Sequence, residues 1–430
     1  MTKPTMGFFP VFAIGVGGMV GGGIFAVLGL ATTLSHGGTP IAFAIAGMIA
    51  LITAYSYSKL SVRYPSEGGT VVFLNHGLGS GRLTGGLNNL LWMSYVVMLS
   101  VYASAFGSYG STFFPETTQV MWSHILLSAA VIGFTVINII STKLVAKSEL
   151  YIVVIKLAIL IGFIVIGFWT INYNHLTPDT WSPPFELLAG GMIIFLAYEG
   201  FELIANSAKD VKNPKKTLPK AFYSAVIFVI ILYILISMVT VGNLSTDQIS
   251  QASEYALAEA AKPFLGHAGF VIIAIAAMLS TGSAINATLY GTSRVSYSIA
   301  KSGELPKLLE NKIKNKPIVG LLITTIATLI VANSLDLSSI ATMGSAGFLL
   351  IFAAVNFSNF RLHKETSSRR WISGAGLASC AFAFAILIWY TVTTSPSDVW
   401  ILAVMIIASF VIEIIYRAKT GRSIRLHSDS

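Results

Sequence analysis

Gly17-Gly18-Met19-Val20-Gly21-Gly22-Gly23-Ile24-Phe25 lies inside the first long hydrophobic segment of the chain. Glycine is a poor helix former, and it adopts backbone angles that other residues avoid. Irregular backbone at bilayer depth is stable only where it is buried in protein or lines a cavity, because lipid cannot hydrogen-bond to it. The stretch therefore predicts a helix that unwinds in the middle of a membrane.

The same glycines have a second interpretation. Gly17 and Gly21 are four residues apart, as are Gly18 and Gly22, and such pairs let a neighbouring helix pack closely against an unbroken one. The run by itself favours the two interpretations about equally. A second interrupted segment elsewhere in the chain would favour unwinding.

The composition is that of a polytopic helical membrane protein. Of the 430 residues, 54% are hydrophobic and 10% are charged, and the mean hydropathy is +0.76. Apolar runs of about 20 residues recur, which is the length of helix that spans about 30 Å of hydrocarbon. We predict an all-α fold of about 12 transmembrane helices, at residues 8–34, 39–62, 82–112, 121–141, 148–171, 185–206, 218–242, 265–299, 317–334, 337–361, 371–393 and 398–417.

The net charge of +9 is a topology signal and does not indicate nucleic-acid binding. Of the 27 lysines and arginines, all but Lys156 and Lys262 fall on one side of the alternating spans. The loops on the other side, residues 35–38, 171–184 and 394–397, contain none. The positive-inside rule then predicts a multi-pass protein of the cell (inner) membrane with both termini in the cytoplasm.

Cys380 is the single cysteine and falls in the eleventh predicted span. No disulfide can form within the chain, and we expect no disulfide-linked accessory subunit. The sequence contains no phosphate-binding loop and no His/Cys cluster with metal-ligand spacing. We therefore expect no catalytic residues, no metal and no bound cofactor, so that an enzyme or an ATP-driven pump is not predicted.

A second interrupted segment lies five spans after the first. In Phe195-Leu196-Ala197-Tyr198-Glu199-Gly200-Phe201-Glu202, two carboxylates and a glycine interrupt the sixth hydrophobic run. A charged group at bilayer depth is costly unless it faces a cavity or a partner, and the alternative is that Glu199 and Glu202 pair with a lysine of a neighbouring helix. Paired interruptions in two five-span halves are typical of an inverted-repeat transporter with a site at the midplane. We expect residues 21–23 and 196–199 to be non-helical and to face each other at mid-bilayer.

These residues also resemble a known family. Val20 to Phe25 resembles the Gly-x-Gly-Ile-Phe element of the amino acid–polyamine–organocation (APC) superfamily, and Phe195 to Phe201 resembles its sixth-helix element. Asp210 to Ala221 is similar to its cytoplasmic signature, and Ser293-Arg294 through Gly303-Glu304-Leu305-Pro306 is similar to the end of its eighth helix. Among its members, the chain most resembles prokaryotic proton-coupled amino acid transporters of broad specificity, which likewise carry a lysine in the fifth helix.

The resemblance implies the LeuT-type fold, a 5+5 inverted repeat with broken helices 1 and 6 and two peripheral helices. We expect residues 1–173 to form the first repeat, residues 174–364 the second, and residues 365–430 the peripheral pair with a cytoplasmic tail. Glu202 resembles an acidic residue of many members. Glu199 departs from the usual apolar residue, which puts the generic substrate pocket in doubt.

Backbone chemistry and the resemblance together predict a site for the head group of an α-amino acid. Freed N–H groups at the positive end of the outer half-helix would hold a carboxylate, and freed carbonyls of both breaks would hold an ammonium. The predicted substrate-binding residues are Met19, Gly21, Gly22, Gly23, Leu196, Ala197 and Glu199. Specificity would come from Met98 or Tyr102 in the third span and from Tyr198 or Phe201 in the sixth, unless these side chains are ordinary bundle core.

Lys156 is the predicted carrier of the coupling proton, since it lies inside the uninterrupted apolar run from Ile152 to Leu160. We expect the charged form of Lys156 to be stabilised by carbonyls of the first break and by a hydroxyl such as that of Ser283. We expect Glu202 to act in coupling or gating. The alternative is a structural lysine that reaches toward the membrane surface or pairs with Glu149. Sodium coupling stays open, because Ser280, Thr281 and Ser283 are hydroxyls that a cation site needs, although such groups more often bond to carbonyls of their own helix.

Three functions follow from these patterns. The favoured one is secondary active transport of amino acids by proton-coupled symport with alternating access. The second is transport or exchange of polyamines or cationic amino acids, because an uncompensated pair of carboxylates in a dry site prefers a cationic ligand. The third is an amino acid receptor that binds without transport.

Overall fold

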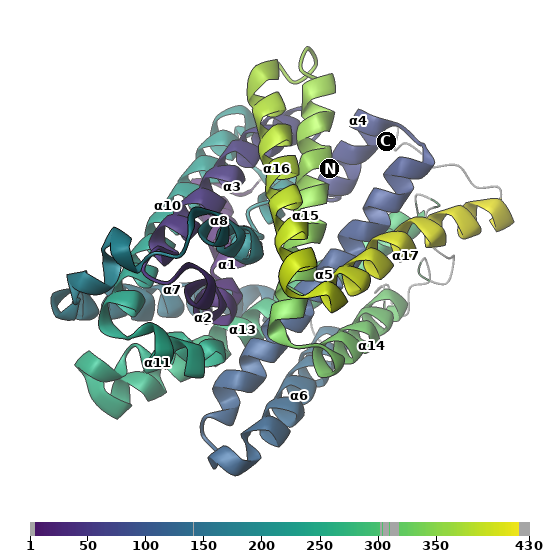
Figure 1. The fold of residues 1–430 in the computed structure, drawn as a ribbon. Helices are drawn as coiled ribbons and strands as arrows, with labels where there is room; N and C mark the ends of the chain where they lie inside the picture. The colour runs from purple at the N-terminus through teal and green to yellow at the C-terminus, as the bar shows by residue number, and fades with distance from the viewer. Residues whose placement is uncertain (1–4, 141, 302, 304–308, 310–317, 421–430) are drawn as a thin grey trace.

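The computed structural model describes residues 5–140, 142–301, 303, 309 and 318–420, and over this part of the chain it is all-α (Figure 1). The α-helices are α1 Phe8–Met19, α2 Gly23–Ser35, α3 Thr39–Arg63, α4 Gly69–Leu78, α5 Arg82–Ser111, α6 Gln119–Ile140, α7 Thr142–Gly167, α8 Pro184–Ile193, α9 Leu203–Asn206, α10 Pro214–Asn243, α11 Thr246–Gln251, α12 Ala256–Glu259, α13 Lys262–Lys301, α14 Ile318–Ser334, α15 Leu337–Arg361, α16 Arg370–Thr394 and α17 Pro396–Thr420. Short 3₁₀ helices join several of them, including η5 Ile194–Tyr198 and η7 Ser253–Tyr255.

The predicted spans are present as helices. Among the described residues, ten helices are long and apolar enough to cross a membrane, and the bent pair α1 and α2 forms an eleventh span. The apolar helix α14 is 17 residues long and takes the place of the ninth predicted span. The prediction of an all-α polytopic membrane protein is thus confirmed, and the span boundaries agree to within a few residues, except that α13 also includes a turn before the left-handed Gly266, whose φ is 63°.

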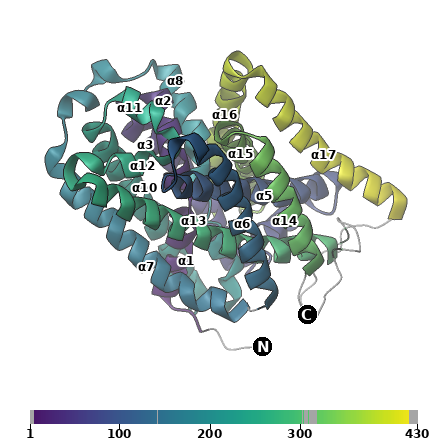
Figure 2. The ribbon, with the colours of Figure 1, turned by 90° about the horizontal axis from the view of Figure 1, so that it is seen from below.

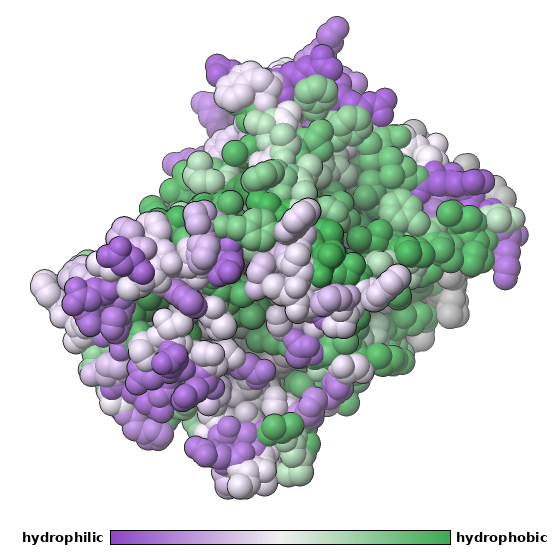
Figure 3. Space-filling view, viewed as in Figure 1, coloured by the Kyte–Doolittle hydropathy of each residue, from purple (hydrophilic) through white to green (hydrophobic). Residues whose placement is uncertain are grey.

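The helices form two groups that meet at the interrupted segments. In one group α10 packs against α3 and α1; in the other, α5 packs against α6, α13 and α15. Figures 1 and 2 show the two groups side by side, and Figure 2 shows α16 and α17 at one edge. Figure 3 shows a hydrophobic band across the molecule with hydrophilic residues at both ends, near the α15–α16 turn and near α11. This distribution fits a protein that crosses a bilayer.

Helix 1 is broken where the glycine run predicts it. α1 ends at Met19, residues 20–22 form a turn, and α2 leaves at 44° to α1. Helix 1 is therefore not the unbroken helix of the second interpretation, but close packing does occur at the break, since a Cβ at Gly18 would lie 2.8 Å from the carbonyl oxygen of Gly200. One expectation is wrong. Gly23 is the first residue of α2 and not part of the unwound segment.

The second break lies a few residues later than expected. After α8, residues 194–198 continue as the 3₁₀ helix η5, so Leu196, Ala197 and Tyr198 are not unwound. The irregular segment begins at Glu199, which is extended, and turns at Gly200, whose φ of 115° favours glycine. A 3₁₀ helix has hydrogen bonds between residues three apart, so the backbone of residues 194–198 remains hydrogen-bonded up to the start of the irregular segment.

Candidate binding site between the two broken helices

The start of α2 offers free backbone donors at the first break. Gly22 is the N-cap of α2 and supplies no side chain to its first turn, so the leading N–H groups lack intrahelical acceptors. These groups lie at the positive end of the helix dipole, where an anion is stabilised. Of the three predicted glycines, Gly21 donates its N–H to the carbonyl oxygen of Gly18 at 3.1 Å, so the backbone groups that remain for a carboxylate are those at the start of α2.

Tyr233 of α10 joins the two breaks. Its hydroxyl lies 2.7 Å from the carbonyl oxygen of Met19 and 3.2 Å from that of Ala197. The carbonyl of Leu196 accepts from the backbone N–H of Glu199 at 3.0 Å. The carbonyl of Leu196 thus has a donor, and those of Met19 and Ala197 share the single proton of Tyr233, so a ligand would use their remaining lone pairs. Sequence reasoning missed Tyr233, whose only signal is a hydroxyl within an apolar run.

Glu199 and Glu202 both point into the protein and away from lipid. Their residues are 4% and 1% exposed, respectively. Tyr102 donates to Glu199 Oε2 at 3.2 Å, and Tyr95 donates to Glu202 Oε1 at 3.2 Å. Glu202 Oε2 also accepts the backbone N–H of Gly200 at 2.7 Å. Within the described residues no lysine or arginine forms an ion pair with either carboxyl group, so the lysine-pairing alternative is not supported.

The two tyrosines belong to a stripe along α5. Tyr95, Tyr102 and Tyr109 are seven residues apart, so they share one helix face. Tyr109 donates to the carbonyl oxygen of Phe25 at 3.2 Å, and the stripe thus contacts both broken helices. Tyr102 also covers the first break, since a Cβ at Gly22 would lie 2.3 Å from its ring. The seven-residue spacing was the sequence signal for Tyr95, which sequence reasoning missed.

The other candidate side chains for specificity are core residues. Tyr198 donates to the carbonyl oxygen of Phe43 at 2.7 Å, and its ring packs against Tyr233. Phe201 is fully buried in an aromatic cluster with Tyr57, Phe222 and Phe352. Met98 is also fully buried. Of the four candidates, the contacts place Tyr102 beside the first break.

Lys156 reaches the first broken helix from α7. Its residue is 1% exposed, and its ammonium donates to the carbonyl oxygen of Gly17 at 3.1 Å. A buried ammonium needs such partners, and the last turn of α1 supplies one because its carbonyls lack intrahelical donors. Ser283 is 5% exposed, on α13. Glu149, the alternative partner of Lys156, lies outside the residues whose side chains are described.

The hydroxyls of α13 divide between two roles. Ser280 donates to the carbonyl oxygen of Val20 at 2.8 Å and also to that of Gly21, so it ties α13 to the unwound turn. Thr281 instead bonds back to the carbonyl oxygen of Ala277 at 2.7 Å, within its own helix. Ser280 is therefore the hydroxyl that supports the break.

Comparison with known proteins decides the family. The family model described as amino acid permease matches residues 6–410. The chain belongs to the amino acid permease family. This identification covers both broken helices and almost all the spans, and it agrees with the APC resemblance.

Several relatives match over most of their length. The chain is 35% identical to the uncharacterized protein MJ0609 of Methanocaldococcus jannaschii, over 96% of this chain and 95% of the relative. It is 33% identical to the inner membrane transport protein YbaT of Escherichia coli, over 97% of each. At 26% identity it matches the methylthioribose transporter of Bacillus subtilis, over 84% of this chain and 81% of the relative. The permease family and these transporter names indicate a transporter.

Proposed function

We propose that this chain is a proton-coupled symporter that carries amino acids across the cell's inner membrane. The two broken helices form the site, and transport is by alternating access of one helix group against the other around it. In this proposal residues 1–173 and 174–364 are inverted repeats, residues 365–430 are peripheral, and both termini are cytoplasmic. No enzymatic step is involved.

The proposal rests on the pair of breaks and on the backbone hydrogen-bonding groups that each break offers. The first turn of α2 supplies N–H donors for a carboxylate, and the carbonyls of Met19 and Ala197, held within reach of one Tyr233 hydroxyl, supply acceptors for an ammonium. Donors and acceptors side by side match an α-amino acid head group. The permease family supports the same class of substrate.

Lys156 is the proposed proton carrier. As an ammonium it makes a charge-assisted bond to Gly17 of α1, which is stronger than the bond of a neutral amine. Gly17 lies three residues before the unwound turn, so protonation of Lys156 favours one position of the broken helix. The proton shifts the equilibrium between two positions of the broken helix only because Lys156 binds it more tightly in one of them. This difference in proton affinity couples protonation to the movement of the helix.

The test is uptake into proteoliposomes driven by a pH gradient, with a panel of radiolabelled amino acids and diamines. We expect Lys156→Ala and the better volume match Lys156→Met to abolish gradient-driven accumulation while substrate binding persists. The matched control is Lys262→Ala, because Lys262 is an exposed lysine paired with Glu259. Undiminished accumulation in the Lys156 variants would contradict the proposal, as would faster wild-type uptake when sodium is added at constant pH.

A second candidate function is transport or exchange of cationic amino acids or polyamines. The observation that favours it is the buried pair Glu199 and Glu202, which has tyrosine hydroxyls and no ion-pair partner in the described part of the chain. A relative with 25% identity, over 95% of this chain, is named cationic amino acid transporter 7, chloroplastic, of Arabidopsis thaliana. The same uptake panel separates the two, and binding without uptake of any compound would instead indicate a receptor.

A further inference from the structure

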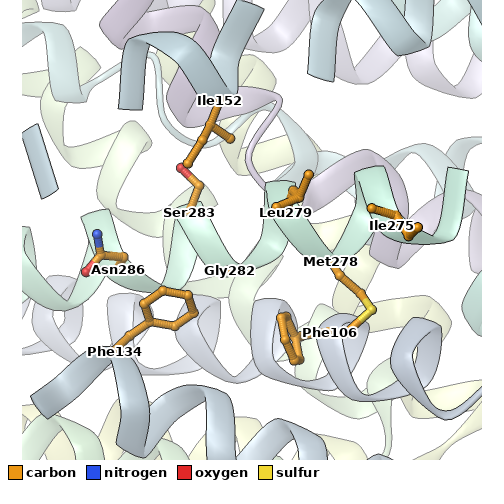
Figure 4. A pocket seen from close by; sticks show the side chains of 9 residues that line it. All are labelled: Phe106, Phe134, Ile152, Ile275, Met278, Leu279, Gly282, Ser283 and Asn286. Carbon is orange, nitrogen blue, oxygen red and sulfur yellow. The ribbon is translucent and has the colours of Figure 1, made fainter. Parts of the chain in front are cut away.

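A groove of about 460 Å³ lies on α13, beside the site between the broken helices, and Ser283 is the one predicted site residue in its lining. Its lining is mostly apolar and comes from α5, α6, α7 and α13: Phe106, Phe134, Ile152, Ile275, Met278, Leu279, Gly282, Ser283 and Asn286. Figure 4 shows Phe106 and Phe134 pointing toward α13 from one side, and Ile152 reaching toward Ser283 from the other. The volume is in the range of sites that hold small molecules.

The groove exists because α6 and α7 both pack on α13 but barely touch each other. Gly282 provides the floor between them. A Cβ at this position would lie 3.0 Å from the ring of Phe134, so a larger side chain would crowd the space. One polar group of the groove is already hydrogen-bonded within the protein, since Asn286 Oδ1 accepts from Asn138 at 2.8 Å.

The exposed residues around the opening of the groove show that it faces the lipid hydrocarbon. Ile275 and Leu279 at the rim are 47% and 46% exposed, and the outward residues Ile132, Val136 and Ile155 of the flanking helices are exposed to a similar degree. In helices that span a membrane, such an exposed apolar surface faces hydrocarbon. The molecules that reach the groove are therefore acyl chains, and an apolar wall suits them.

We propose that this groove is a binding site for one acyl chain of a bilayer phospholipid. The acyl chain lies between α6 and α7 over Gly282 and fills space that water would otherwise enter. Because Ile152 lies one helical turn before Lys156 on α7, the bound chain covers the helix face next to the buried lysine. The lipid site does not depend on what the protein transports.

The experiment uses the full chain in vesicles of phosphatidylcholine doped with a phosphatidylcholine that carries a photoreactive diazirine in its acyl chain. After illumination, labelled residues are mapped by mass spectrometry. We expect labelling of Phe106 and Phe134, which are only partly exposed, several-fold above that of the fully buried Phe195. Labelling of both at the level of Phe195 would overturn the proposal.

Variants that fill the groove provide the second arm. Met278→Trp and Ile152→Phe add volume from opposite walls, and each should reduce labelling of Phe106 and Phe134 several-fold. The control Ile272→Trp lies on the outer face of the same helix, with Ile272 49% exposed and outside the groove, and should leave it unchanged. Unchanged labelling in both filling variants, or protection of the two phenylalanines by a second copy of the chain at high protein density, would contradict an acyl-chain site.

Discussion

Gly22 shows how one missing side chain makes room for the site. A Cβ would lie 2.3 Å from the Tyr102 ring and 3.2 Å from Thr281, at the point where α2 presents its first N–H groups. Overpacking of this kind costs about 1–3 kcal/mol. We expect Gly22→Val to lower substrate affinity by at least about tenfold, which corresponds to about 1.4 kcal/mol, while the protein still inserts.

The matched control is Gly133→Val on α6, where a Cβ has no neighbour within 4 Å. Binding is measured by equilibrium binding of labelled substrate to purified protein. Wild-type affinity in Gly22→Val would contradict the assignment of the first break as a binding element.

Glu199 and Glu202 are expected to differ in role although they are three residues apart. Glu202 accepts a backbone N–H and a tyrosine hydroxyl and so helps to hold the second break, whereas Glu199 has the Tyr102 hydroxyl beside the first break. We predict that Glu199→Gln shifts the preference from cationic toward neutral substrates by about tenfold, or about 1.4 kcal/mol, because it removes a buried carboxyl group that can ionise to pair with a bound cation.

Competition of cationic and neutral amino acids for one labelled substrate measures this preference. Glu202→Gln is the comparison and should impair gradient-driven uptake without the same shift. An identical substrate preference in Glu199→Gln and wild type would disprove the tuning role of Glu199.

At the scale of elements, Tyr233 couples α1, η5 and α10. Each hydrogen bond between membrane helices contributes about 0.6 kcal/mol, so loss of the bonds to Met19 and Ala197 should cost roughly 1 kcal/mol. We predict that Tyr233→Phe lowers the unfolding temperature in detergent and weakens substrate binding, because the two breaks lose their common donor.

Tyr223→Phe is the control on the same helix, because the described residues offer its hydroxyl no hydrogen-bond partner. A thermal-shift assay with and without substrate reports both effects. Equal stability and equal substrate-induced shifts in Tyr233→Phe and wild type would show that the bridge does not matter.

At the scale of the whole molecule, the prediction concerns orientation. On the positive side, Lys212 lies just before α10 and the exposed Lys215 lies in its first turn; on the other side, the exposed Ser397 lies in the first turn of α17. We expect an impermeant thiol reagent added to intact cells to label Ser397→Cys but not Lys215→Cys. The background is low, because Cys380 is fully buried. Labelling of Lys215→Cys from outside would reverse the assigned topology.

The sequence by itself determined the class, the spans and the places where helices break. Hydropathy gives the spans because lipid requires long apolar helices, and the glycine run locates the first break because glycine weakens a helix wherever it stands. The carboxylates of the sixth span locate the second break because charge at bilayer depth needs a partner. The same cost singled out Lys156, whose ammonium donates to the carbonyl oxygen of Gly17 on the first broken helix.

The tertiary structure decided what each group contacts. Only the packing shows that Tyr233 bridges both breaks, that Tyr95 donates to Glu202 and Tyr102 to Glu199, and that Tyr198 belongs to the core. It also moved the second irregular segment to Glu199 and placed Gly23 within α2. The physical reason is that hydropathy and propensity are local, whereas a hydroxyl in an apolar run finds its partner on another helix, and that helix is chosen by the packing of the whole bundle.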